Sequence, residues 1–450
     1  MSQGKKQVVV LGGGPAGVAA AIRAAQLGAS ATLVEEGRIG GVCLNQGCLP
    51  YRIMGSALEE LQGQSLPDPA GLRRRVAQTV DYVRAGTEGL LTANRVRVVK
   101  GRGRLQGPGS VRVGEELIPA DLIVLATGAG WQKPGLPGQD LPGVIDPDRL
   151  LAQEERPESI LILGGDPWAV ELAWIYHRLG SRVGLVMEGP FLPEIDRQVA
   201  NRLKNIFNRA GLKTMAKARP IRISSSGKGL ALEVEVRGEK KTLTAATVVP
   251  TGRAPGLEGL GLGSAGVEVG HGALKVDSSF RTTNGAVMAV GDLTGQPLLS
   301  HKASAQGEAA VEVGLGVRPR PELPPIPLVL YTRPEAAGVG LTEKEAKARG
   351  LEVICGEIPY GVNARAAAEG VAEGFVKIVC GAKHHEVLGV HLLGPQSVEL
   401  ITQAALALKL EATAEELARL IVPHPSFAEA LADAARMVLG RAMYVPPQTS

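Results

Sequence analysis

The chain contains few cysteines and few aromatic residues, and it lacks any long apolar run. Only 4 of its 450 residues are cysteine, which excludes the disulfide-rich framework of a small secreted protein. Phenylalanine, tryptophan and tyrosine make up 3% of the chain and are scattered, which argues against a surface that stacks the bases of single-stranded nucleic acid. No stretch of about 18 consecutive apolar residues occurs, so we expect no membrane-spanning helix.

The chain also has little net charge. The value of +4 is low for this length, and the run Arg73-Arg74-Arg75 falls in a helical pattern, which favours a solvated face over a nucleic-acid patch. The first apolar run begins at residue 8, which leaves no room for a signal peptide. We therefore expect a cytoplasmic protein that binds neither nucleic acid nor a membrane, with a length that fits about three domains.

A strand–helix–strand pattern with a glycine fingerprint opens the chain. The three segments of this βαβ pattern are residues 8–11, 19–27 and 31–34. The first turn fits G-x-G-x-x-G through Gly12, Gly14 and Gly17, and Glu35 ends the second strand. Such glycines let a pyrophosphate approach the helix N-terminus, and the acidic residue can accept hydrogen bonds from ribose hydroxyls. This unit therefore predicts a dinucleotide site.

A second βαβ pattern in mid-chain carries an altered fingerprint. Its segments are residues 160–163, 171–179 and 183–187. Asp166 stands where the second glycine belongs, Ala169 replaces the third, and Glu188 ends the unit. We expect the Asp166 carboxylate to face the pyrophosphate, at a cost of about 2–3 kcal/mol for each phosphate charge. In the competing arrangement, this side chain turns outward and caps the following helix.

Two cysteines, Cys43 and Cys48, lie just after the first dinucleotide unit. A bare C-x4-C spacing also occurs among packing residues and metal ligands, but a zinc site needs further Cys or His ligands and none lies nearby. We therefore predict no metal site. A close cysteine pair beside a cofactor fold in a cytosolic protein favours redox chemistry. The other cysteines, Cys355 and Cys380, fall in predicted strands and are expected to be buried, inert thiols.

Two later segments are predicted to return to the first unit, because each is a strand end that meets a glycine turn. They are Thr127-Gly128 and Gly291-Asp292. Asp292 is placed to accept a hydrogen bond from a ribityl or ribose hydroxyl.

The pattern changes from about residue 324. Alternating runs typical of antiparallel strands occur at residues 375–379 and 387–391, and helical patterns at 398–410 and 415–420. This part is predicted to be an α+β domain, and residues 319–327, with five prolines, are the expected linker.

Four motifs resemble those of the flavoprotein pyridine nucleotide-disulfide oxidoreductases, and most closely those of the dihydrolipoamide dehydrogenases. GGVCLNQGCLPYR at residues 40–52 is similar to the family's redox motif GGTCLNxGCIPSK. PLLSHKA at 297–303 resembles the end of its flavin segment, and YTRPE at 331–335 resembles the opening of its interface domain. HPSFAE at 424–429 is similar to the end of its HxHPTxSE tail, so the likeness runs nearly end to end.

The resemblance implies an α/β fold with two doubly wound Rossmann-like nucleotide-binding domains and a C-terminal α+β dimerisation domain. We predict an FAD-binding domain at residues 1–146 and an NAD-binding-like domain at 147–276. A central segment at 277–323 would complete the FAD site, and the dimerisation domain would span 324–450. A homodimer follows, because in this family the catalytic histidine reaches the disulfide of the partner subunit.

The resemblance also implies a role for each site residue. Cys43 would be the outer, interchange sulfur, Cys48 would lie against the flavin, His424 would be the base, and Glu429 would orient it. The residues implied in FAD binding are Gly12, Gly14, Gly17, Glu35, Arg52, Thr127, Gly128, Gly291, Asp292, Leu299 and Ala303. Those implied in NAD binding are Gly164, Glu171, Glu188 and Gly252. The expected reaction is oxidation of dihydrolipoamide, on a lipoyl-bearing protein or as a small dithiol, through the disulfide and FAD to NAD.

Departures from the family pattern leave an alternative open. Arg52 replaces the family lysine, whose partner would here be Glu171, and Tyr51 and Val422 replace a serine and a histidine. With Asp166 in the second fingerprint, the alternative is a related disulfide reductase that has a degenerate NAD site and uses another electron acceptor or disulfide substrate. A hypothesis from another class is a flavin-binding or scaffolding protein without enzymatic activity. Such a protein would not need the cysteines, His424 and Glu429 all at the positions of the family motifs.

Overall fold

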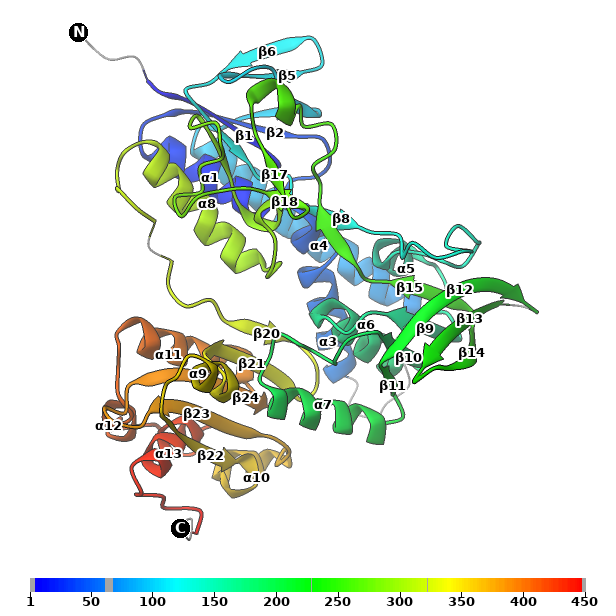
Figure 1. The fold of residues 1–450 in the computed structure, drawn as a ribbon, viewed down its shortest axis with the longest axis vertical. Coiled ribbons are helices and arrows are strands. Elements are labelled where there is room, and N and C mark those ends of the chain that lie inside the picture. The colour runs from blue at the N-terminus through cyan, green and yellow to red at the C-terminus, as the bar shows by residue number, and fades with distance from the viewer. Residues whose placement is uncertain (1–4, 61–67, 228, 322, 447–450) are drawn as a thin grey trace. The chain divides into compact units, whose positions relative to one another are not determined.

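The computed structural model of the chain describes residues 5–60, 68–227, 229–321 and 323–446 (Figure 1). Residue 322 of the expected linker and the last four residues of the C-terminal tail lie outside them. Two compact units are present. The first consists of residues 1–134, 146–155 and 252–323, and the second of residues 135–145, 156–251 and 324–450.

A five-stranded parallel sheet forms the centre of the first unit. Its order is β19 (Val287–Ala289), β7 (Leu122–Leu125), β1 (Gln7–Leu11), β2 (Ser30–Glu35) and β3 (Arg97–Lys100). Val8 of β1 lies opposite Ala31 of β2 and Leu122 of β7. The strands are rich in valine and leucine because both faces of the sheet are covered.

The alternation of side chains along β1 assigns the two faces. Val8 and Val10 pack with helices α1 (Pro15–Gln26) and α8 (Ser300–Gly314), which lie side by side. Val9 and Leu11 pack instead with a small antiparallel sheet. Its strands are β4 (Gly103–Leu105), β5 (Ser110–Val113) and β6 (Glu116–Pro119). The sequence does not predict this sheet, because its strands are only three or four residues long.

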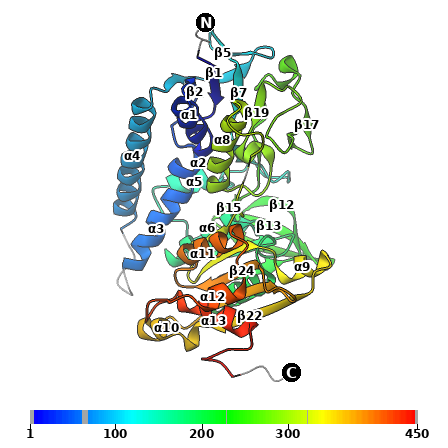
Figure 2. The ribbon, with the colours of Figure 1, turned by 90° about the vertical axis from the view of Figure 1, so that its left-hand side faces the viewer.

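Further elements of the first unit lie outside the parallel sheet. Helices α2 (Gly41–Asn45), α3 (Cys48–Glu60) and α4 (Pro69–Ala93) follow β2, and α3 and α4 lie against each other (Figure 2). Strand β8 (Ala129–Trp131) pairs antiparallel with β16 (Arg253–Pro255), and α5 (Pro147–Ala152) follows in the chain. Two short strands, β17 (Val269–Gly270) and β18 (Ala273–Leu274), pair antiparallel before β19.

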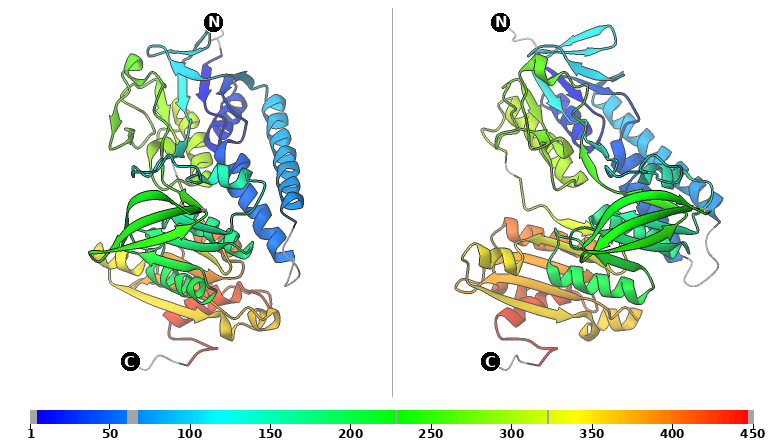
Figure 3. Two further views of the ribbon diagram at one scale, coloured as in Figure 1. Left: turned by 90° about the vertical axis from the view of Figure 1, so that its right-hand side faces the viewer. Right: turned by 45° about the vertical axis from the view of Figure 1, so that its right-hand side comes forward.

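The second unit contains the other parallel sheet. Its order is β11 (Lys213–Ala216), β10 (Arg182–Met187), β9 (Ser159–Leu163) and β15 (Thr247–Pro250). Helix α6 (Pro167–Arg178) follows β9, and α7 (Arg197–Arg209) follows β10. An antiparallel sheet, visible as the green ribbon in Figure 3, shares a core with β9. Its strands are β12 (Ala218–Ser226), β13 (Gly229–Val236) and β14 (Glu239–Ala245), which the sequence also does not predict.

An antiparallel sheet dominates the C-terminal part of the second unit. Its order is β20 (Leu328–Leu330), β21 (Glu335–Gly340), β24 (Val387–Gly394), β23 (Phe375–Gly381) and β22 (Val353–Pro359). The helices of this part are α9 (Glu343–Ala348), α10 (Ala364–Glu369), α11 (Ser397–Lys409), α12 (Ala414–Ala418) and α13 (Glu429–Val438). The predicted fold class is therefore confirmed.

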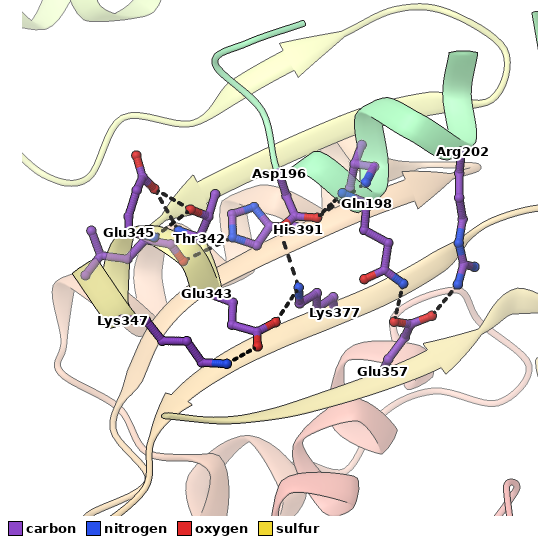
Figure 4. A network of polar contacts seen from close by, with 12 residues as sticks. Asp196, Gln198, Arg202, Thr342, Glu343, Glu345, Lys347, Glu357, Lys377 and His391 are labelled. Atoms are coloured by element: carbon purple, nitrogen blue, oxygen red, sulfur yellow. Dashed lines mark hydrogen bonds and ion pairs between the residues drawn. The ribbon is translucent and has the colours of Figure 1, made fainter. Parts of the chain in front are cut away.

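A charged cluster fastens the start of α7 to this antiparallel sheet within the second unit (Figure 4). Lys377 and Asp196 are both buried, and Lys377 Nζ lies 3.5 Å from Asp196 Oδ2 and 3.1 Å from Glu343 Oε2. Further along α7, Arg202 Nη2 lies 2.6 Å from Glu357 Oε1 of β22. Because Asp196 also caps α7, these pairs hold the segment that follows β10 in a fixed place.

Candidate active site

The two cysteines of the predicted redox pair lie where one short helix ends and another begins. Cys43 is in α2, and Cys48 is the first residue of α3, so its sulfur lies at a helix N-terminus, where the dipole favours a thiolate. Both side chains are half-buried, and both cysteines are free thiols in the structure. The disulfide between the pair stays a prediction.

The two sulfurs share a hydrogen bond, and a hydroxyl group from a distant segment joins them. The bond between the sulfurs lowers the pKa of Cys43 to about 7, although burial opposes this, and it raises the pKa of Cys48. Ser300 Oγ, at the start of α8, lies 3.6 Å from Cys48 Sγ and lowers the pKa of both thiols. A thiolate at Cys43 is therefore available near neutral pH.

The turn that carries Cys43 is held by an amide side chain. Asn45 Nδ2 donates hydrogen bonds to the carbonyl oxygens of Ile39 and Gly41, at 3.0 and 2.9 Å. Asn45 Oδ1 accepts a hydrogen bond of 3.1 Å from Arg84 Nη1 on α4. The loop between β2 and α3 is thus tied to α4, which fixes the position of the cysteine pair.

The glycines of the first fingerprint fulfil the geometric demands of a dinucleotide turn. Gly12 follows β1 with φ +105°, and Gly14 is the N-cap of α1. A Cβ at Gly17 would lie 1.8 Å from Gly12 O, so only glycine allows this helix to approach the strand so closely. The N-terminus of α1 is therefore open to a pyrophosphate in the manner of this motif.

A cavity of about 560 Å³ lies beside this turn, within the first unit. Glu35 and Thr127 line it, together with Gly12, Arg102 and Trp131. The Glu35 carboxylate accepts hydrogen bonds from the backbone nitrogens of Gly13 and Gly37, each at 2.5 Å, which holds it at the wall. The size and lining suit an adenosine group, with Glu35 placed for the ribose hydroxyls.

Residues from the later segment lie close to the same turn. Gly291 has φ +69°, and a Cβ built on it would lie 3.3 Å from Ala303 Cβ and 3.4 Å from Ala16 Cβ, which places α8 against the start of α1. Asp292 Oδ2 lies 3.3 Å from Arg253 Nη1, and burial raises the pKa of this carboxyl against the opposing effect of Arg253. Leu299 is the N-cap of α8.

The remaining predicted FAD residues lie in the same unit. Gly128 has φ +76° beside Thr127, whose hydroxyl donates to Gly256 O at 3.4 Å, and Arg52 Nη1 on α3 lies 3.6 Å from Glu59 Oε1. An FAD site needs a glycine turn, a cavity and a carboxylate such as the half-buried Asp292, so the first unit fits this cofactor.

The second fingerprint corrects one expectation. Asp166 does not point freely toward a pyrophosphate, because its carboxylate caps α6 and accepts hydrogen bonds from Ala169 N at 3.1 Å and Thr251 Oγ1 at 3.0 Å. The side chain caps the helix, as in the competing arrangement, but it does not turn outward, because it is bonded to the buried Thr251. It follows that the backbone donor that a pyrophosphate would use is already engaged.

The predicted NAD residues lie around this turn, with one exception. Gly164 follows β9, Glu188 is exposed directly after β10, and Glu171 Oε1 on α6 accepts a hydrogen bond of 2.9 Å from Tyr331 N. Gly252 belongs to the first unit, where its carbonyl oxygen accepts a hydrogen bond from Gln132 N at 2.8 Å. The predicted pairing of Glu171 with Arg52 would join the two units and stays a prediction.

The C-terminal His–Glu pair is formed within the second unit. His424 Nδ1 lies 2.9 Å from Glu429 Oε1, and Ser426 N donates to Glu429 Oε2 at 2.7 Å. Burial raises the pKa of Glu429, but the bonds from His424 and Ser426 outweigh it, so the pKa is lowered. The His424 side chain is 67% exposed and Glu429 only 18%, so the imidazole is presented outward from a fixed carboxylate.

Sequence reasoning missed several residues that the structure places at these sites. They are Ser300 beside the cysteines, Arg253 beside Asp292, Thr251 beside Asp166 and Arg84 beside Asn45. Ser300 lies inside the motif at 297–303, and Thr251 and Arg253 flank Gly252. The motifs thus indicate these segments as parts of a site, but the sequence does not show which residues they contact. Cys380 is buried as expected, whereas Cys355 is only half-buried, and burial raises the pKa values of these thiols to about 12 and 11.

Comparison with known proteins decides the family. A family model described as pyridine nucleotide-disulphide oxidoreductase matches residues 6–307, and the model of its dimerisation domain matches residues 326–435. The chain belongs to this family. The match confirms the resemblance drawn from the motifs, and the dimerisation domain supports a homodimer.

Individual members of the family show which proteins this oxidoreductase is similar to. It is 36% identical to the dihydrolipoyl dehydrogenase of Thermus scotoductus over 457 residues, which cover 97% of this chain and 98% of that protein. The dihydrolipoyl dehydrogenase of Bacillus subtilis is 35% identical over 470 residues, with the same coverage. A solved Cu(II) complex of the HOCl-induced flavoprotein disulfide reductase RclA from Escherichia coli superposes with a TM-score of 0.87 at 27% identity, over 97% of this chain and 100% of that one.

These relationships confirm the enzyme class and the cofactors of the family. The oxidoreductase is a flavoprotein of the class that acts on sulfur groups, and the cofactors that members use are FAD and NAD. Across the part of the chain that the structure describes, no helix is long and apolar enough to cross a membrane. In the same described residues, no group of three or more His, Cys, Asp and Glu side chains is arranged to hold a metal ion.

Proposed function

We propose that this oxidoreductase oxidises dihydrolipoamide, on a lipoyl-bearing protein or as a small dithiol, and transfers the electrons through the Cys43–Cys48 pair and FAD to NAD. The hydrogen-bonded cysteine pair beside a glycine turn that fits FAD supports this proposal best. Similarity to dihydrolipoyl dehydrogenases over almost the whole chain supports the choice of substrate.

The sulfur chemistry balances within the chain and its substrate. A substrate thiolate attacks Cys43 Sγ of the disulfide, so the Cys43–Cys48 bond breaks, a mixed disulfide forms and Cys48 leaves as a thiolate. The second substrate thiolate then attacks the substrate sulfur of that mixed disulfide, which closes the oxidised lipoyl ring and releases Cys43. When bound, FAD supplies a two-electron acceptor for the reduced pair, and NAD accepts the electrons afterwards.

His424 is proposed as the base that takes the substrate's thiol proton. Its Nδ1 is engaged by Glu429, which leaves Nε2 for the substrate, and the carboxylate stabilises the imidazolium that forms. In the proposed homodimer, His424 serves the cysteine pair of the partner subunit. The cytoplasm stays our prediction for the location.

A second candidate uses the same dithiol chemistry with a different electron acceptor or disulfide substrate. The capping of α6 by Asp166 favours it, because this arrangement removes a pyrophosphate donor. The likeness to a disulfide reductase adds support.

Anaerobic titration of the purified flavoprotein tests the proposal. The first equivalent of dihydrolipoamide should reduce the disulfide, form one oxidised lipoamide and give a thiolate beside oxidised flavin, and a second equivalent should be consumed for each flavin that is bleached. Reduced glutathione at an equal thiol concentration is the matched comparison, since it cannot close a ring after the first exchange. Failure of every dithiol to reduce the flavin, while a chemical reductant succeeds, would remove both candidate functions.

A further inference from the structure

The carboxylate of Asp166 is held at the N-terminus of α6 from two sides. Its Oδ1 accepts a hydrogen bond of 3.1 Å from Ala169 N, and its Oδ2 accepts one of 3.0 Å from Thr251 Oγ1. Thr251 is 2% exposed, follows β15 and also lies 3.2 Å from Leu163 O at the end of β9. A buried hydroxyl from a neighbouring strand thus fixes this carboxylate above the helix.

The first turn of α6 has few unoccupied backbone N–H groups that could bind an anion. Position N1 is Pro167, which has no N–H. The backbone groups of Trp168 and Ala169, at N2 and N3, both bond to the Asp166 carboxylate, and with Thr251 they lower its pKa against the larger opposing effect of burial. In a dinucleotide fold these N–H groups are the ones that bind the pyrophosphate.

A second carboxyl group, that of Glu194, lies near this turn. Burial, and then the charge of Asp166, raise the pKa of Glu194, which precedes α7. The chain here is also fixed, because Leu192 N donates to Gly165 O at 2.8 Å and the next helix is held by Asp196 and Lys377. The fold therefore keeps the carboxyl groups of Asp166 and Glu194 near each other.

We propose that Asp166 is an internal substitute for the dinucleotide pyrophosphate, so that the second nucleotide fold binds NAD(H) weakly until this carboxylate is displaced. The proposal rests on the proposed function only in taking this fold as the NAD site. Asp166 acts as a specificity-determining residue, because it disfavours ligands that carry a diphosphate at the N-terminus of α6.

Binding measurements on the FAD-loaded protein test this. NAD+ and ADP-ribose are titrated by calorimetry into the wild type, Asp166→Asn and Asp166→Gly. Asparagine removes the charge, keeps one acceptor oxygen for Ala169 N and turns an amide donor toward the Thr251 hydroxyl, and it should tighten binding about tenfold. Glycine also frees the helix donors and should tighten it by about ten- to a hundredfold, the effect of one charge about 6 Å from a phosphate at an effective dielectric constant of about 20.

Two controls separate charge at this turn from general effects. Adenosine, which lacks the diphosphate, should bind equally to all three proteins. Asp68→Gly removes another aspartate that caps a helix ahead of a proline, at the exposed start of α4, and should leave the affinity for NAD+ unchanged. The gain from Asp166→Gly should also grow at low ionic strength, where screening is weaker.

The outcomes are decisive for the proposal and separable from the proposed function. Micromolar binding of NAD+ by the wild type, with no gain in either variant, would show that Asp166 is only a helix cap. If the glycine variant fails to fold, the asparagine variant carries the test alone. Flavin bleaching by dihydrolipoamide should be equal in all variants, and its loss in the wild type would count against the proposed function without touching the binding result.

Discussion

Cys48 Sγ lies 3.6 Å from Ser300 Oγ, which brings the first residue of α3 together with the first residue of α8. The hydroxyl can donate a hydrogen bond to a thiolate of the redox pair. It therefore links the sulfur chemistry to the segment that also carries Leu299 and Ala303.

Replacing Ser300 by alanine should raise the pKa of the Cys43 thiol above its value of about 7. A thiolate is the form present above the pKa, so alkylation of the reduced protein by iodoacetamide should begin at higher pH in the variant. A hydrogen bond to a charged group is worth about 1.5 kcal/mol or more, which corresponds to a shift of about one pH unit. Ser300→Thr keeps the hydroxyl and should retain the wild-type profile, whereas superimposable profiles for alanine and wild type would contradict this role.

The two cysteines should differ in their spectroscopic effect. After two-electron reduction, we expect a long-wavelength band from a thiolate beside oxidised flavin. Cys48→Ser should abolish this band, because Cys48 is proposed to lie against the flavin, whereas Cys43→Ser should retain a thiolate there. Absorbance spectra of both variants, matched for flavin content, give the answer, and an unchanged band in Cys48→Ser would reverse the assignment.

The fingerprint glycine Gly17 should be intolerant of a single methyl group. Its Cβ would lie 1.8 Å from Gly12 O, so Gly17→Ala must push α1 away from β1, at a cost of about 1–3 kcal/mol or more and with loss of FAD. Gly86→Ala in α4 is the matched control, because no atom lies within 4 Å of its Cβ and alanine is the better helix former by about 1 kcal/mol. The unfolding temperature and the flavin content should thus fall in Gly17→Ala, whereas Gly86→Ala should keep its flavin and be at least as stable as the wild type. Equal behaviour of the two variants would show that the close approach is not needed.

The sequence predicted those parts of the fold in which local pattern and tertiary role agree. Both βαβ units and the antiparallel domain follow from apolar periodicity, although α1 begins at Pro15 rather than near residue 19, because proline at N1 suits a helix start. The sheet of β12, β13 and β14 was not predicted. The seven residues of β14 include Glu239, Lys240 and Lys241, so its exposed face hides the strand pattern.

The candidate site was predictable only where its partners are close in sequence. His424 and Glu429 are five residues apart and meet as expected, although their catalytic role remains a prediction. Cys48 and Ser300 are separated by 252 positions, and Asp166 and Thr251 by 85, so only the folded chain reveals these contacts. For this reason the sequence alone allows both orientations of Asp166.

The proposed base should act across a dimer. His424→Gln should slow dithiol oxidation by about 10²–10⁴-fold, the span expected for a lost general acid–base, while flavin content and chemical reduction of the flavin stay the same. Glu429→Gln should slow it less, because the base remains but loses the carboxylate bonded to its Nδ1.

Co-expression of differently tagged His424→Gln and Cys48→Ser chains would give mixed dimers. If His424 serves the partner subunit, one of the two sites in a mixed dimer contains both an intact cysteine pair and an intact histidine, and purified heterodimers should regain up to about half of the wild-type rate. If both groups of one site came from a single chain, neither site would be complete, and heterodimers would be as inactive as the parent variants. Absence of rescue in heterodimers that retain full flavin would therefore place the site within one subunit and overturn the proposed role of the dimer.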